Sequence, residues 1–153
     1  MILVDANLLI YAIDEDSPHH KAARRWVEGA FSGSTTIGIS WTVILAFLRL
    51  TTRPGILKRP MAPEAALDFV DEWLALPSVE IVVPGERHWD VFRNLLEAAG
   101  TAGNLTSDAH LAALAIERGA TVYSADTDFG RFLGLRHVNP LNQPVRARAT
   151  RRR

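Results

Sequence analysis

The sequence has 153 residues and contains no cysteine. This absence excludes a disulfide scaffold, a zinc site with thiolate ligands and thiol catalysis, and it suits a reducing cytoplasm. No apolar run approaches the roughly 18 residues that span a bilayer. Asp5 and Asn7 interrupt the apolar N-terminus too early for a signal peptide. We therefore expect a cytoplasmic protein without a membrane partner.

A net charge is also lacking, because 17 Lys and Arg balance 17 Asp and Glu. The balance hides an asymmetry, since residues 1–145 hold 12 basic and 17 acidic residues, a net charge of −5. The remaining five basic residues are Arg146, Arg148, Arg151, Arg152 and Arg153. Such a tail is either a solvated end or a contact for RNA phosphates, so nucleic acid stays open as a partner.

The chain shows no internal repeat, and its length fits one domain that buries roughly 70% of its unfolded surface. Short apolar runs predict strands, and they alternate with amphipathic segments that Pro and Gly bound. The strands are expected at residues 2–4, 36–39, 79–83, 121–123 and 135–138. Helices are expected after Ser17, Ser40, Pro63 and Thr106 or Ser107. The alternation predicts an α/β fold with a mostly parallel sheet over residues 1–141, followed by a basic tail over 142–153.

Four carboxylates fall where they need an explanation. Asp5, Asp126 and Asp128 follow strands, and Asp108 lies in the first turn of a helix. Ligands bind at the carboxyl ends of the strands in an open parallel sheet. Two unit charges about 4 Å apart repel by about 4 kcal/mol at an effective dielectric of about 20, so four converging carboxylates require a cation or raised pKa values. All-oxygen ligands favour Mg²⁺ or Mn²⁺, and zinc is disfavoured because no His pair has ligand spacing.

Each of these acids also has a purely structural interpretation. Asp108 suits a helix N-terminus by its charge. Asp126 and Asp128 are good turn formers. Asp5 is harder to explain without a site, because it ends an apolar central strand. Taken together, the four positions favour a metal site.

Four segments carry a family resemblance: MILVDANLLIYA, ISWTVILAFLRLTT, GNLTSDAHLAALAIERGATVYSADTDFGRF and LRHVNPL. In order and spacing they resemble the PIN-domain ribonuclease toxins of the VapC type, over roughly residues 1–141. The resemblance implies a three-layer α/β/α sandwich and Mg²⁺- or Mn²⁺-dependent endoribonuclease activity on tRNA or rRNA. It also implies a VapB-type antitoxin that covers the acidic groove, and a homodimer.

The resemblance assigns roles to particular residues of this chain. Asp5, Asp108 and Asp126 match the family's principal metal-binding acids, and Asp128 matches a frequent auxiliary acid. Ser124 stands where the family often has a small hydroxyl residue near the metal. These residues are expected to form one catalytic metal site.

One position departs from the family pattern. Many members carry a Glu where Ala46 stands, and no acid occurs from residue 34 to residue 61. Thr42 and Arg49 share the helical face of Ala46. The departure puts a second metal ion in doubt. Arg49 either holds the scissile phosphate or makes a structural salt bridge at the groove wall.

Other side chains have weaker functional indications. Asn104 is expected to shape a loop, and His110 to be a helix-surface or packing residue. The tryptophans are expected in the core or an interface rather than as base-stacking platforms, and five basic residues are candidates for an RNA-contacting rim. These are Trp26, Trp41, Trp73 and Trp89 in the first set, and Arg24, Arg25, Arg53, Lys58 and Arg59 in the second.

Three hypotheses follow. The first is a metal-dependent endoribonuclease that acts as the toxin of a toxin–antitoxin pair. The second, motivated by Ala46, is a non-catalytic PIN-fold module that binds an antitoxin but lacks a full metal site. The third, a phosphatase of the haloacid-dehalogenase type, fails because Asn7 stands where its second Asp would be.

Overall fold

The computed structural model describes residues 1–142, so the five arginines of the basic tail lie outside the described residues. A five-stranded sheet forms the centre of the molecule, with the strand order β3-β2-β1-β4-β5. Every pair of neighbouring strands is parallel. The strands are β1 (Ile2–Val4), β2 (Ile37–Ser40), β3 (Val79–Val82), β4 (Thr121–Tyr123) and β5 (Arg136–Val138).

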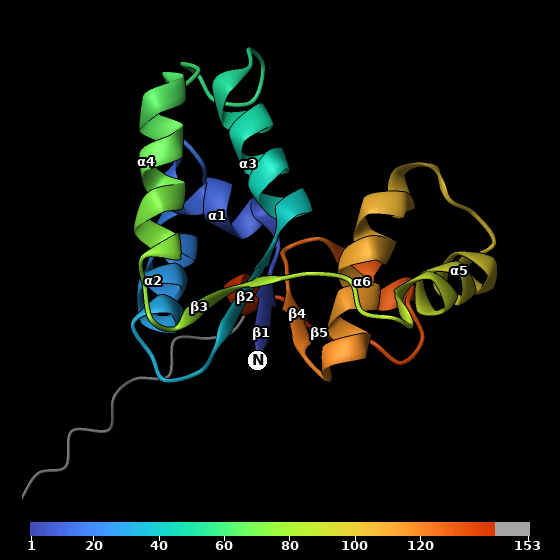
Figure 1. Cartoon of the computed structure of the whole chain (residues 1–153). Coiled ribbons are helices and arrows are strands. Elements are labelled where there is room, and N and C mark those ends of the chain that lie inside the picture. Colours follow the sequence, from blue (N-terminus) through green and yellow to red (C-terminus); the bar gives the residue numbers. More distant parts are fainter. Residues whose placement is uncertain (143–153) are drawn as a thin grey trace, which may run out of the picture.

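Six helices flank this sheet in two groups. The first group is α1 (Ala6–Ile13), α2 (His20–Phe31), α3 (Trp41–Thr52) and α4 (Pro63–Leu74), and the second is α5 (His88–Ala99) and α6 (Thr106–Arg118). The two groups lie on opposite sides of the strands, as Figure 1 shows. Three 3₁₀ turns complete the described part: η1 (Gly103–Leu105), η2 (Thr127–Arg131) and η3 (Pro140–Asn142). The predicted three-layer α/β/α sandwich is confirmed.

Local sequence signals set most element ends. The Ser40 side chain caps α3 by accepting a hydrogen bond from the Val43 amide at 3.3 Å. Pro63 occupies the first turn of α4, where its missing N–H costs nothing. Gly119 ends α6 with φ of 60°, a left-handed conformation that favours glycine. These three ends lie where the sequence predicts them.

The core is built from the central strands and the helix faces that cover them. Leu3, Ile39 and Val122 are fully buried on three adjacent strands. On the α3–α4 side, the rings of Phe47 and Trp73 meet edge to face with centroids 4.8 Å apart. This core fixes the strand ends that carry the site.

Some expected positions differ in the structure. Of the tryptophans expected in the core or an interface, Trp41 and Trp89 are not in the core, since 55% and 65% of their surfaces are exposed. A helical stripe shows which side chains align but not whether a neighbouring element covers them. The expected cap of α6 by Thr106 or Ser107 is also absent, because the 3₁₀ turn η1 leads directly into the helix and no side chain caps it.

The strand order identifies where a ligand can bind. Along the chain, β2 and β3 are added on one side of β1, and β4 and β5 on the other side. The direction in which strands are added therefore reverses between β1 and β4. In open α/β sheets, ligands bind outside the carboxyl ends of the strands at such a switch point. No helix within residues 1–142 is long and apolar enough to cross a membrane.

Candidate metal centre and groove

Asp5 and Ser124 meet at the switch point. Parallel pairing sets Val4 beside Tyr123, so the next residue of each strand emerges at the same edge. Ser124 is fully buried and donates a hydrogen bond to Asp5 Oδ2 at 2.6 Å. The other carboxylate oxygen of Asp5 accepts from the Ala6 amide at 2.7 Å, so both oxygens are held.

Ser124 is the centre of a small network. Its hydroxyl oxygen accepts from Asn7 Nδ2 and from the Asp126 amide, both at 3.0 Å. Asn7 Oδ1 in turn accepts from the Ala125 amide at 3.3 Å. The network therefore ties the start of α1 to the loop after β4, and it orients the carboxylate of Asp5.

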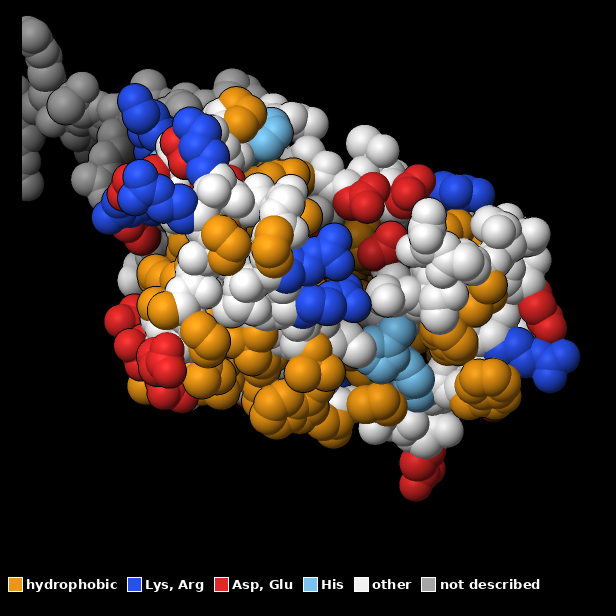
Figure 2. Space-filling view, turned by 90° about the horizontal axis from the view of Figure 1, so that it is seen from above, with side chains coloured by type: hydrophobic (Ala, Val, Ile, Leu, Met, Phe, Trp, Pro, Cys, Tyr) orange, Lys and Arg blue, Asp and Glu red, His pale blue; other side chains and the backbone are white. Residues whose placement is uncertain are grey.

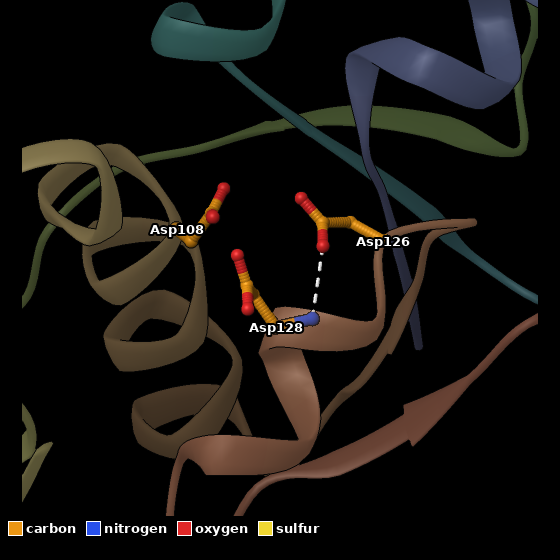
Figure 3. Close-up of side chains that lie close together, drawn as sticks. All are labelled: Asp108, Asp126 and Asp128. Atoms are coloured by element: carbon orange, nitrogen blue, oxygen red, sulfur yellow. Dashed lines mark hydrogen bonds between the residues drawn. The ribbon is translucent and has the colours of Figure 1, made fainter.

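Three further carboxylates converge beside this network. One oxygen each of Asp108, Asp126 and Asp128 lies within 4.8 Å of the others. Asp108 comes from the first turn of α6, while Asp126 and Asp128 come from the loop after β4 and from η2 (Figure 3). The Asp128 backbone amide donates to Asp126 Oδ1 at 2.8 Å, which fixes the Asp126 side chain against the backbone of Asp128. The structure thus brings together the acids that the sequence singled out.

Burial and mutual repulsion disfavour the ionised forms here. Burial first, and then the charges of Asp5, Asp126 and Asp128, raise the pKa of Asp108 to about 7. The pKa of Asp5 is raised above its usual value chiefly by burial, although the hydrogen bond from Ser124 opposes the shift. Asp5 and Asp108 therefore belong to one electrostatic unit with the other two acids.

This arrangement fits a hard divalent cation. The donors are carboxylate oxygens, which Mg²⁺ and Mn²⁺ prefer, and a bound cation relieves the repulsion that raises the pKa of Asp108. Asp128 is half exposed, with 50% of its side chain accessible, so it suits an auxiliary or water-mediated contact. Asp108, Asp126 and Asp128 are close enough to share one ion, and Asp5 lies beside them.

A groove of about 400 Å³ runs past the carboxylates. Asp5 and Asp108 line one wall, and Thr42, Ala46 and Arg49 of α3 line the other. Figure 2 shows acidic side chains and Lys or Arg side chains facing each other across this surface. Ala46 lines the groove, as its place on the expected helical face with Thr42 and Arg49 predicts.

Arg49 is free to act on a ligand. Within residues 1–142 it forms no ion pair, and the expected alternative of a structural salt bridge is not seen there. An exposed guanidinium opposite a carboxylate cluster suits a phosphodiester that bridges the groove.

Some expected positions lie away from the groove. Asn104 is exposed in η1, in agreement with a loop-shaping role. Among the rim candidates, Arg24 pairs with Glu28 at 2.7 Å, and Lys58 pairs with Asp16 at 3.2 Å. Both pairs are exposed and leave these cations at the surface.

Sequence reasoning missed two features near the site. Asn7 braces Ser124, and its only sequence signal is its position two residues after Asp5. His110 is not a simple surface residue, because its Nδ1 lies 2.9 Å from Nε2 of His88 on α5. His88 in turn contacts Glu117, so three distant positions form one buried cluster.

The fold and the carboxylate cluster define the class of protein. The family model of the PIN domain matches residues 2–134, so the chain belongs to the PIN domain family. It is 49% identical to Ribonuclease VapC37 of Mycobacterium tuberculosis over 140 residues, which cover 92% of this chain and 97% of that protein. Ribonuclease VapC33 of the same organism is 40% identical over 143 residues, 94% and 100% of the two chains. Within the PIN family the chain is a member of the VapC ribonucleases.

Solved structures agree on the fold. VapBC2 from Rickettsia felis, bound to a DNA fragment from its promoter, aligns with a TM-score of 0.67 at 23% identity, over 91% of this chain and 98% of the other. Mycobacterium tuberculosis VapC20, described as a sarcin-ricin loop cleaving toxin, aligns with a TM-score of 0.63 at 20% identity, over 89% and 99%. At these identities the likeness concerns the fold alone.

Proposed function

We propose that this chain is the toxin of a type II toxin–antitoxin pair and cleaves RNA as a divalent-metal-dependent endoribonuclease in the cytoplasm. The observation that carries the proposal is the convergence of Asp108, Asp126 and Asp128 within 4.8 Å, beside Asp5, in a VapC ribonuclease. Asp5 belongs to the same unit because its charge raises the pKa of Asp108. A divalent cation at this cluster would relieve the repulsion among the carboxylates.

Each residue has a stated role in this proposal. Asp5, Asp108 and Asp126 hold Mg²⁺ or Mn²⁺, and Asp128 assists from its half-exposed position. A bound ion of this kind activates water and neutralises the charge that develops on a phosphodiester. Arg49 binds the scissile phosphate across the groove. No side-chain nucleophile is required.

The proposed substrate is tRNA or rRNA, and the proposed partner is a VapB-type antitoxin. The relatives named ribonucleases and the VapC20 toxin that cleaves the sarcin-ricin loop support an RNA substrate. Structures described as VapBC complexes, from Rickettsia felis and Salmonella typhimurium, support the antitoxin. We expect the protein to form a homodimer. In each subunit, an antitoxin segment is expected to cover the carboxylate groove.

Cleavage of RNA in the presence of Mn²⁺, with and without EDTA, tests the activity. Wild-type protein is expected to cleave, EDTA is expected to stop it, and Asp5→Asn should lower the rate by at least about a hundredfold because a buried ligand is lost. Asp68→Asn on the exposed surface of α4 is the matched control and should cleave like wild type. Equal cleavage by wild type and Asp5→Asn would contradict the proposal.

Ala46 favours one alternative, a non-catalytic PIN-fold module that binds the antitoxin without a full metal site. The α3 wall of the groove carries no carboxylate, so fewer ligands face a cation than in many members of the family. Calorimetric titration with Mn²⁺ separates the two functions. A protein that binds no Mn²⁺ yet binds an antitoxin would support the alternative.

A further inference from the structure

A second hollow adjoins the carboxylate groove, between α3, α5 and α6. It has a volume of about 340 Å³, within the range of small-ligand sites. Two of its lining residues, Thr42 and Ser107, also line the groove beside Asp5 and Asp108. A chain that occupies the groove can therefore place its next unit in this hollow. The lining residues are Thr42, His88, Trp89, Phe92, Thr106, Ser107 and His110.

A buried hydrogen-bonded chain supports one wall of the hollow. Glu117 Oε2 lies 2.9 Å from His88 Nδ1, and His88 Nε2 lies 2.9 Å from His110 Nδ1. Only 14% of the His88 side chain and 10% of the Glu117 side chain are exposed. Glu117 also accepts from the Gly85 amide at 3.3 Å, so the loop before α5 is attached to the same carboxylate. The wall is therefore a fixed structure.

This chain of contacts sets the orientation of His110. A carboxylate can only accept, so His88 Nδ1 carries the hydrogen that faces Glu117. His88 Nε2 and His110 Nδ1 then share one hydrogen across 2.9 Å, and the His110 ring lines the hollow. A ligand there meets a hydrogen-bonding imidazole held in a defined orientation.

Helix α5 adds an aromatic surface to the hollow. Trp89 is 65% exposed, and its ring lies 5.9 Å from that of Phe92, which in turn stacks on His88 at 6.2 Å. Figure 2 shows histidine and hydrophobic side chains side by side next to the acidic cluster. Unstacked bases of single-stranded RNA stack on rings of this kind.

We propose that this hollow binds one nucleotide of the RNA substrate, with its base stacked on Trp89 and with the His110 imidazole hydrogen-bonded to it. The inference rests on the proposed function, because it places this nucleotide next to the phosphate held at the carboxylates. The hollow combines the rings of Trp89 and Phe92 with the hydroxyls of Thr106 and Ser107, which suits a nucleotide with an apolar base face and polar edges. Its continuity with the groove favours RNA over a second copy of the chain.

Ligand-observed NMR titration of the full chain in EDTA tests the inference, with the four ribonucleoside 5′-monophosphates as probes. At least one nucleotide is expected to bind wild type. Trp89→Ala and His110→Ala should each weaken it by about tenfold, the effect of losing one stacking ring or one oriented hydrogen-bonding ring. Trp89→Phe keeps a ring and should bind nearly as well as wild type, which separates stacking from any general damage to the fold.

Trp41→Ala is the matched control, because Trp41 is also exposed, at 55%, but does not line the hollow. It should leave nucleotide affinity unchanged. Absence of binding by all four nucleotides, or equal affinity of Trp89→Ala and wild type, would overturn the inference. A change of oligomeric state in Trp89→Ala, seen by light scattering without a change in nucleotide affinity, would assign the hollow to a protein interface instead. RNA cleavage without nucleotide binding contradicts this inference alone, while binding without cleavage contradicts the proposed activity.

Discussion

Asp108 couples the stability of the protein to pH. Its pKa is raised from 3.8 to about 7 by burial first and then by the neighbouring acids, so the folded chain holds a proton that the unfolded chain releases. Without metal, the contribution of Asp108 to stability should therefore be largest below about pH 4. It should fall as the pH rises through about 7. The loss is complete above the folded pKa, where the carboxylate is ionised in both states.

The first prediction follows from this sign. In EDTA, wild type should melt at a lower temperature at pH 8 than at pH 5, and Asp108→Asn should reduce that difference by about a few degrees. Thermal melts at the two pH values measure it. Asp5 also has a raised pKa, so part of the difference should remain. Asp68→Asn is expected to behave like wild type. If Asp108→Asn keeps the full wild-type difference in melting temperature between the two pH values, the raised pKa of Asp108 is contradicted.

The hydroxyl of Ser124 is expected to stabilise the fold. Its buried hydroxyl serves Asp5, Asn7 and the Asp126 amide, so Ser124→Ala leaves three polar groups without this partner. We expect a loss of about 1–3 kcal/mol in the free energy of unfolding, measured by urea denaturation. Ser17→Ala, at an exposed turn, should change it by less than about 1 kcal/mol. A similar loss in both variants would show that the network adds no stability.

Among the elements, helix α3 decides how strongly the groove binds a cation. Its groove face presents Thr42, Ala46 and Arg49 and no carboxylate. Ala46→Glu should restore an acidic ligand, tighten Mn²⁺ binding by about tenfold or more, and lower metal-free stability through added repulsion. Calorimetry with Mn²⁺ measures the first effect. Ala46→Gln, of similar size but uncharged, is the control, and equal affinities of the two variants would contradict the placement of residue 46 at the cation.

The elements also show what the sequence can and cannot predict. Asp5 and Asp126 could be assigned to one site because parallel strands end at one edge of the sheet. The contact between His88 and His110 could not, because it joins two helices whose packing no local pattern specifies. The exposure of Trp89 could not be predicted for the same reason, since the residue that α5 buries is Leu95.

At the scale of the whole molecule, the placement of charge matters more than its sum. Residues 1–145 carry a net charge of −5, and the five remaining arginines follow. A body of this sign repels RNA unless a cation, Arg49 and other basic groups compensate. One divalent ion in the groove would bring the body to −3.

Truncation after residue 142 tests the role of the basic segment, which lies outside the described residues. If its arginines contact RNA phosphates, removing residues 143–153 should weaken RNA binding. It should also make the logarithm of the RNA-binding constant depend less steeply on the logarithm of the salt concentration. Binding measured between about 50 and 200 mM salt gives both quantities. An unchanged slope would mean that the segment is only a solvated end.

The central claim is that Asp5, Asp108, Asp126 and Asp128 form one cation site. Anomalous diffraction from a crystal grown with Mn²⁺ tests it most directly, because manganese is located independently of any activity. The account predicts an anomalous peak among these four carboxylates, within coordination distance of Asp108 and Asp126. A crystal with full Mn²⁺ exposure and no peak there, or with peaks only elsewhere on the surface, would contradict it.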